Sequence, residues 1–236
     1  MILSFFQILY VVLITFAVGV VEVLASPFDR GGHVFYWLSR IHSYTILKVC
    51  GVRVSVKGLD NLDLAQTYIF VSNHASLFDI PSVIHGFPGR VRMVYKKELE
   101  RIPFFGWGLK FSNVYIGIDR GRGQEASKSL DAAIEKIKGG ASVLLFAEGT
   151  RTLDGKLQPF KRGAFNIAVR AGVPVVPLTI NGSYKILQKG SIKLRSGDVT
   201  LVFDKPILPP GVNGKEAEIG LRDRVHEVIE SHYVDQ

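Results

Sequence analysis

The sequence predicts an α/β fold: a single sheet domain with flanking helices, preceded by an N-terminal membrane-associated helical segment. Short apolar runs bounded by turn residues predict the sheet, at residues 52–56, 68–71, 91–95, 114–118, 142–146 and 173–180. Between two of these runs, residues 126–137 place alanine, leucine and isoleucine at helical spacing in a polar stretch, which is typical of a helix crossing over a sheet. An uncharged apolar N-terminus predicts the membrane segment.

That segment comprises residues 2–20, which contain no charged side chain. A helix of this length, rising about 1.5 Å per residue, matches the ~30 Å hydrocarbon layer of a bilayer. A signal peptide is the alternative, but the basic n-region is missing and Glu22 stands where a small-residue cleavage site is expected. Arg30, Arg40 and Lys48 follow closely, which places the rest of the chain on the cytoplasmic side.

The stretch from Val34 to Cys50 alternates aromatic and aliphatic residues with polar and basic ones, which is typical of an interfacial helix. A core helix of the globular domain is the alternative. The first helix can either span the bilayer or dip into one leaflet and return through the second, and the sequence leaves both topologies open. Residues 1–50 are therefore predicted to be a membrane anchor. Near the C-terminus, we expect a hairpin within residues 191–207 and an amphipathic helix over residues 215–233.

The formal net charge of +8 favours an anionic partner: a phosphate-bearing substrate, an acidic lipid surface or nucleic acid. The basic residues are dispersed and show no recognition-helix pattern, so we expect no nucleic-acid partner. Cys50 is the single cysteine, which excludes an internal disulfide and a cysteine-built metal cluster. The six histidines form no compact ligand motif, and neither a metal nor a cofactor is expected.

The most informative motif is the run from Ser72 to Asp79, SNHASLFD, directly after a strand that reads as buried. Five residues of continuous helix rotate by about 500°, so His74 and Asp79 would lie about 140° apart on one helix and could not meet. His74 is therefore predicted in the turn and Asp79 in the first helical turn. There the carboxylate can accept the imidazole N–H and leave the other nitrogen as a base. A helix cap beside a satisfied buried histidine is the alternative for this spacing alone.

A second block, FAEGTR at residues 146–151, also ends an apolar strand and is followed by PFKRGAF at residues 159–165. Arg151, Lys161 and Arg162 offer cations for a phosphate, and arginine has a planar fork that matches two phosphate oxygens. A solvated basic loop is the alternative.

Two further blocks complete the set. The block YIGIDR at residues 115–120 ends in Arg120, which is either a phosphate ligand or the partner of Asp119. The block VPVVP at residues 173–177 is expected to be a core strand that lines the cleft.

The ordered set closely resembles the glycerolipid acyltransferase family typified by bacterial 1-acylglycerol-3-phosphate acyltransferases, over about Val52 to Leu178. In this family N-H-x-x-x-x-D is followed by a G-x-I-x-I-D-R-like block, F-x-E-G-T-R and V-P-V-x-P, and no block is missing here. Gly117 replaces a usual large apolar residue. Three intervening runs are also similar to the family, at residues 96–99, 102–107 and 159–164.

The resemblance implies an acyltransferase catalytic domain over residues 51–236, in which the acceptor's own hydroxyl is the nucleophile. His74 would remove the hydroxyl proton, and Asp79 would orient the imidazole. Backbone N–H groups near Gly149, or at the helix start after His74, would stabilise the oxyanion. Six residues would bind substrate, of which the arginines and the lysine hold the acceptor's phosphate: Lys96, Arg120, Glu148, Gly149, Thr150 and Arg151.

The implied reaction transfers a fatty acyl group from acyl-CoA or acyl carrier protein to the sn-2 hydroxyl of 1-acylglycerol 3-phosphate (lysophosphatidic acid). Phosphatidic acid results, as in phospholipid biosynthesis. Another lysolipid or glycerol 3-phosphate remains open as acceptor, and so does a non-catalytic, membrane-anchored module that binds acidic lipid. A serine hydrolase is disfavoured because no G-x-S-x-G occurs and Ser76 is too close to His74. The Gly-Lys pairs lack the upstream glycine of a nucleotide-binding Walker A loop.

Overall fold

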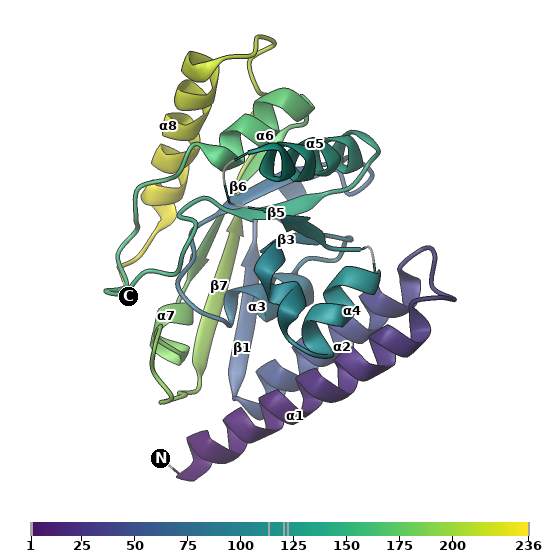
Figure 1. The fold of residues 1–236 in the computed structure, drawn as a ribbon. Coiled ribbons are helices and arrows are strands. Elements are labelled where there is room, and N and C mark those ends of the chain that lie inside the picture. Colours follow the sequence, from purple (N-terminus) through teal and green to yellow (C-terminus); the bar gives the residue numbers. More distant parts are fainter. Residues whose placement is uncertain (1, 113, 120, 122, 236) are drawn as a thin grey trace.

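The computed structural model describes residues 2–112, 114–119, 121 and 123–235. Seven strands within these residues form one sheet, with helices packed on both of its faces (Figure 1). The spatial order of the strands is β1-β7-β6-β2-β5-β3-β4. Their bounds are Val52–Lys57 for β1, Ile69–Ser72 for β2, Arg92–Lys96 for β3, Ile116–Ile118 for β4, Val143–Phe146 for β5, Val175–Asn181 for β6 and Gly197–Phe203 for β7. The predicted α/β sheet domain is confirmed.

Five neighbouring strands, from β6 through β4, run parallel to one another. Strand β7 is antiparallel to β6, and β1 is parallel to β7. The carboxyl ends of the five parallel strands therefore meet at one edge of the sheet, where ligand sites of open α/β sheets form. Strands β2 and β5 lie side by side in the middle of this group, so the segments that follow them are neighbours at that edge.

Two layers of helices cover the sheet (Figure 1). One consists of α5 (Gln124–Lys138), α6 (Gly163–Ala171) and α8 (Lys215–His232), and the other of α2 (His33–Val49), α3 (Asp79–Gly86) and α4 (Phe105–Ser112). Successive side chains of a strand point to opposite faces, so Ile69 and Val71 of β2 pack with the first layer and Phe70 with the second. Short helical turns make connections: η1 (Leu59–Asn61), η2 (Lys97–Arg101) and α7 (Ser183–Ile186).

The N-terminal helix α1 (Ile2–Ala25) lies alongside α2 and α4 (Figure 1). Gly19 permits this close approach, because a Cβ there would lie 3.1 Å from the backbone carbonyl of Phe104. The Oγ1 of Thr15 is 2.9 Å from Nε2 of His42 on α2. By length and composition α1 can cross a membrane. Its outward side exposes large apolar side chains: Ile2, Leu3, Phe5, Phe6, Leu9, Val12 and Leu13.

Helix α2 has one face in the core, as the core-helix alternative for residues 34–50 describes, and the contact of its other face with a membrane stays a prediction. Phe35 and Leu47 are buried in the core, whereas Trp37, Ile41 and Tyr44 are exposed.

The hairpin expected within residues 191–207 is wrong. This stretch contributes one strand, β7, whose two edges are occupied by β1 and β6. No edge of β7 is left to pair with a second strand from the same stretch. The residues before it instead connect to α7, where the N–H of Arg195 donates to the carbonyl oxygen of Ile186 at 2.9 Å.

Candidate active site

Asn73 completes the hydrogen bonding of β2 where that strand ends. Its Nδ2 donates to the carbonyl oxygen of Ile180, and its Oδ1 accepts from the N–H of the same residue, both at 2.8 Å. The Asn73 side chain thus takes the place of one more main-chain pair between β2 and β6. The backbone of the next residue, His74, can then leave the sheet and begin a turn.

His74 and Asp79 meet across this turn, in the arrangement that their spacing predicts. Asp79 is the first residue of α3 and is fully buried, and its Oδ2 lies 2.7 Å from Nδ1 of His74. The same oxygen accepts the N–H groups of Ala75 and Ser76 at 2.8 Å and 3.0 Å. The positive end of the helix dipole also favours a carboxylate there. Since a carboxylate only accepts, Nδ1 is the donor and Nε2 of His74 carries the lone pair of a base.

The loop after β5 fixes His74 on its other sides. The Phe146 ring stacks on the imidazole, with centroids 3.9 Å apart and an interplanar angle of 16°. Oε1 of Glu148 accepts the His74 N–H at 2.8 Å, and the N–H of Thr152 donates to the His74 carbonyl oxygen at 2.9 Å. The side chain of His74 stays 16% exposed, so a substrate can reach the imidazole.

Glu148 is a buried carboxyl group, only 3% exposed. Its Oε2 has no hydrogen-bond partner within the described residues. Burial raises the pKa of Glu148 to about 8 and the charge of Asp79 acts in the same direction, whereas hydrogen bonds from the backbone of His74 and Gln158 oppose the rise. At neutral pH the carboxyl group is therefore mostly protonated, and it can donate a hydrogen bond to a hydroxyl oxygen.

Lysine side chains flank residues 149–151. Gly149 has a φ of +74°, and a Cβ on it would lie 2.9 Å from Cδ of Lys161, so Lys161 lies across its backbone. Nζ of Lys189 donates to Oγ1 of Thr150 at 2.9 Å and to the carbonyl oxygen of Arg151 at 3.4 Å. Sequence reasoning missed Lys189, because it stands outside every block and no local pattern marks it.

Lys96, another of the predicted phosphate ligands, stands apart from this cluster. Lys96 is exposed at the end of β3, with its Nζ 3.0 Å from Oε1 of Glu98. Strand β5 lies between β3 and β2, which puts Lys96 roughly 10 Å, two strand spacings, from the strand that leads to His74. Lys96 pairs in register with Ile118 at the end of β4. Arg120 lies outside the described residues.

The oxyanion donors expected at the helix start after His74 are already engaged. The N–H groups of Ala75 and Ser76 both donate to Asp79, so for these two residues the expectation is wrong. A buried carboxylate requires such donors. The N–H of Gly149 donates to the carbonyl oxygen of Phe146 at 3.1 Å. The hydroxyl of Ser76 is buried as well and donates to the carbonyl oxygen of Leu187 at 2.8 Å.

The fold and the site together define an α/β protein with a histidine at the carboxyl edge of a parallel sheet, oriented by a buried carboxylate and flanked by cations. The profile of the Acyltransferase family matches residues 53–181, more than half of the chain. The protein belongs to this acyltransferase family.

Two curated relatives are similar to this chain over most of its length. The chain is 36% identical over 181 residues to the chloroplastic 1-acyl-sn-glycerol-3-phosphate acyltransferase of Brassica napus, covering 76% of this chain and 51% of that protein. A chloroplastic 1-acyl-sn-glycerol-3-phosphate acyltransferase of Arabidopsis thaliana is 33% identical over 213 residues, covering 88% and 56%. The chain thus spans about half the length of these curated relatives.

A solved structure matches almost the whole chain. The crystal structure of the 1-acyl-sn-glycerophosphate (LPA) acyltransferase PlsC from Thermotoga maritima superposes with a TM-score of 0.80. It is 28% identical in sequence, and the match covers 98% of this chain and 94% of that one.

The raised pKa of Glu148 predicts a pH-dependent loss of stability. An acid with a higher pKa in the folded state favours folding while protonated, and this contribution disappears as the pH rises from the ordinary value of 4.5 to about 8. Glu148→Gln keeps an oxygen for the His74 N–H but stays neutral. Its Tm minus that of the wild type should therefore increase across this pH range, as measured by thermal unfolding in detergent.

Glu98→Gln is the matched control. Glu98 is exposed and its pKa is lowered, chiefly by its own backbone N–H and by Lys96, so its contribution to stability changes mainly below the ordinary value of 4.5. The Tm difference for this variant should not vary with pH. A Tm difference for Glu148→Gln that is equally flat would contradict the raised pKa.

Proposed function

We propose that this protein is a 1-acylglycerol-3-phosphate O-acyltransferase, which moves a fatty acyl group from a thioester donor to the sn-2 hydroxyl of lysophosphatidic acid and forms phosphatidic acid. The observation that carries the proposal is the 2.7 Å contact between His74 and a fully buried Asp79, at the sheet edge next to residues 148–151. The names of the Brassica and Arabidopsis relatives and of the Thermotoga protein support the same substrates. Either acyl-CoA or acyl carrier protein serves as donor.

In this mechanism Nε2 of His74 removes the proton of the acceptor hydroxyl as its oxygen attacks the thioester carbonyl carbon. Asp79 stabilises the imidazolium that forms. When the tetrahedral intermediate collapses, the C–S bond breaks and the departing sulfur takes the proton back from His74. The enzyme is then unchanged, and the products are the new ester and the free thiol of the donor.

The surroundings of His74 favour direct transfer over an acyl-enzyme. Ser72 and Ser76, each two residues from His74, are both buried, and their hydroxyls donate to the carbonyl oxygens of Asn73 and Leu187. Cys50 is the one thiol in the sequence; it is buried, and burial raises its pKa to about 11. A protonated, inaccessible thiol is a poor nucleophile. The acceptor hydroxyl is left as the group that His74 activates.

We assign the acceptor's phosphate to Arg151 together with Lys161 and Lys189, because the two lysines flank the same short segment. Arginine supplies a planar fork for two phosphate oxygens, and the lysines add positive charge. Glu148, in its neutral form, and the Gly149 backbone shape the glycerol pocket beside Thr150. Lys96 and Arg120 remain secondary candidates for the phosphate.

We further propose that residues 1–50 anchor the catalytic domain, residues 51–236, to the cytoplasmic face of the membrane. Contacts between α1 and the rest of the chain run along the helix: Oγ of Ser4 donates to the Leu194 carbonyl, Thr15 contacts His42, and Gly19 packs on Phe104. A helix held along the domain in this way favours insertion into one leaflet over spanning. The reaction cleft then stays at the membrane, where lysolipid and product reside.

His74→Ala should lower transfer by about a hundredfold to ten-thousandfold, the usual contribution of a general base, and Asp79→Asn should also lower it by orders of magnitude. The measurement is thiol release from the acyl donor in the presence of lysophosphatidic acid. His232 and Asp204 form a second, exposed pair with Nε2 and Oδ2 2.9 Å apart. His232→Ala and Asp204→Asn are the matched controls and should retain activity. Substantial transfer by the His74 variant would refute the mechanism.

Arg151→Lys should reduce kcat/KM for a phosphorylated acceptor by roughly ten- to a hundredfold, because lysine keeps the charge but loses the fork that binds two phosphate oxygens. An acceptor without the phosphate should be hardly affected. The control is Arg170→Lys: Arg170 lies on α6, where its Nη2 is 2.6 Å from Asp131. Equal losses for both acceptors would make Arg151 structural and would move the phosphate to Lys96 and Arg120.

A further inference from the structure

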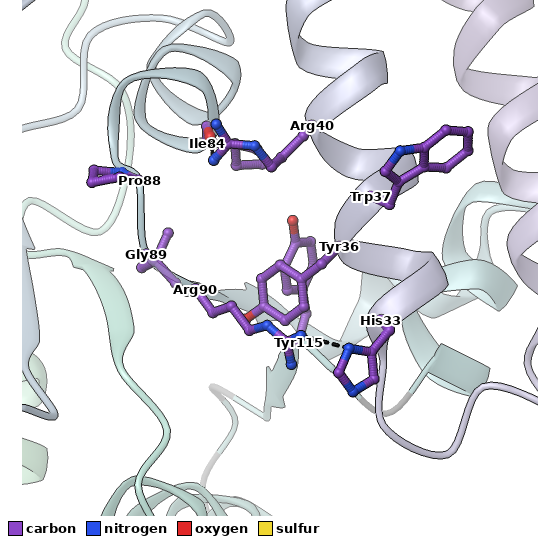
Figure 2. Close-up of a pocket in the computed structure, with 10 residues that line it drawn as sticks. His33, Tyr36, Trp37, Arg40, Ile84, Pro88, Gly89, Arg90 and Tyr115 are labelled. Atoms are coloured by element: carbon purple, nitrogen blue, oxygen red, sulfur yellow. Dashed lines mark hydrogen bonds between the residues drawn. The ribbon is translucent and has the colours of Figure 1, made fainter. Parts of the chain in front are cut away.

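A cavity lies between α2 and the loop that joins α3 to β3. Its volume is about 280 Å³, and Trp37 is among the residues that line it. Figure 2 shows Tyr36 and Arg40 of α2 on the side of the helix that faces the loop residue Arg90. This is the far end of α3: the helix begins at Asp79, and its eight residues carry the chain roughly 12 Å before the loop starts. The cavity is therefore separate from the site around His74.

The cavity is rich in cationic groups. Nη1 of Arg40 donates to the carbonyl oxygens of Ile84 and Phe87 at 3.3 Å and 3.1 Å, which anchors its guanidinium at the rim. On the opposite wall, Nη2 of Arg90 is 2.6 Å from Nδ1 of His33. No acidic side chain is among the described residues that line the cavity. Two guanidinium groups without a lining carboxylate suit a phosphate, which accepts hydrogen bonds from several N–H groups at once.

Aromatic and apolar groups make up the rest of the lining. The guanidinium of Arg90 lies 5.3 Å from the centroid of the Tyr36 ring, and Trp37 is 63% exposed at the mouth. The exposed side chains of Ile41 and Tyr44 lie on the same face of α2 as Trp37. Ile41 is four residues after Trp37, and Tyr44 is three residues after Ile41. Tryptophan and tyrosine next to basic residues are typical of the headgroup layer of a membrane. The cavity thus combines a phosphate-binding wall with an edge suited to lipid.

We propose that this cavity is a second lipid site, which binds the phosphate headgroup of an anionic glycerophospholipid of the bilayer apart from the reacting lipids at His74. Arg90 and Arg40 hold the phosphate, and the acyl chains leave past Trp37 along the apolar face of α2. The proposal rests on the membrane attachment proposed above. The positive net charge of the protein attracts acidic membranes in general. The cavity would add specific recognition of the headgroup of a single lipid molecule.

Trp37 provides a direct readout, because the sequence contains two tryptophans, Trp37 and Trp107. In a Trp107→Phe background Trp37 is the single tryptophan, and its fluorescence is quenched only by bromine close to the cavity mouth. The experiment compares phosphatidylcholine vesicles that carry the same fraction of brominated phosphatidylglycerol or brominated phosphatidylcholine. We expect stronger quenching by phosphatidylglycerol, and we expect Arg90→Gln to abolish the excess.

The matched control is Lys48→Gln, which removes one exposed charge from the same helix but lies outside the cavity. It should preserve most of the excess quenching, and Arg90→Lys should lose most of it because lysine lacks the fork. Equal losses in Lys48→Gln and Arg90→Gln would show general charge attraction and would overturn the site. No excess quenching by phosphatidylglycerol, together with a rise in Tm on addition of inorganic phosphate that Arg90→Gln abolishes, would assign the cavity to free phosphate instead of lipid.

The outcome is independent of the proposed reaction. Equal quenching by both lipids, unchanged in Arg90→Gln, would mean that Trp37 meets the membrane without selecting a headgroup, and it would overturn the proposal while leaving acyl transfer untouched. Transfer to dispersed short-chain lysophosphatidic acid should be the same for Arg90→Gln and the wild type. If Arg90→Gln lowers the Tm, His33→Gln serves as a second test. It removes the contact partner of Arg90 and should also lower the excess quenching by phosphatidylglycerol.

Discussion

Burial of the Asp79 carboxylate is the constraint on which the rest of the site depends. A carboxylate removed from water is unfavourable by several kcal/mol unless donors surround it, and here three donors meet one oxygen: the His74 ring and the N–H groups of Ala75 and Ser76. All three belong to the turn that leaves β2, so the carboxylate determines the shape of that turn. The Asn73 side chain, bonded to Ile180, fixes the point at which the turn departs from the sheet.

Three polar groups of His74 consequently have partners, and Nε2 is left to act as the base. Its N–H is held by Glu148, its carbonyl oxygen by Thr152 and its ring by Asp79, with Phe146 against the ring face. Such fixation keeps Nε2 in place without further ordering when a substrate arrives. Because burial and the charge of Asp79 raise the pKa of Glu148 to about 8, its carboxyl group avoids placing a second negative charge next to the histidine.

Local features could be predicted from the sequence, and distant contacts could not. His74 and Asp79 are five residues apart, so helix geometry alone placed the turn, and the apolar runs located the sheet. The expected hairpin was wrong because β7 pairs with β6, the strand before it along the chain, and with β1, which lies 145 residues earlier. Lys189 reaches Thr150 across 39 residues, and Gly19 of α1 meets Phe104 on a distant segment; no pattern marks either contact. The N–H groups of Ala75 and Ser76 cannot bind the oxyanion because both already donate to the buried Asp79 carboxylate, a contact that the motif alone does not reveal.

In the proposed reaction His74 activates the acceptor hydroxyl, and no acyl group is bound covalently to the protein at any stage. Intact-protein mass spectrometry after mixing the purified chain with acyl donor alone, without acceptor, tests it most directly. The mass should stay unchanged over the time of many turnovers, and product should form as soon as lysophosphatidic acid is added. A mass increase of one acyl group that forms in the wild type, disappears on addition of acceptor and is absent in His74→Ala would contradict direct transfer.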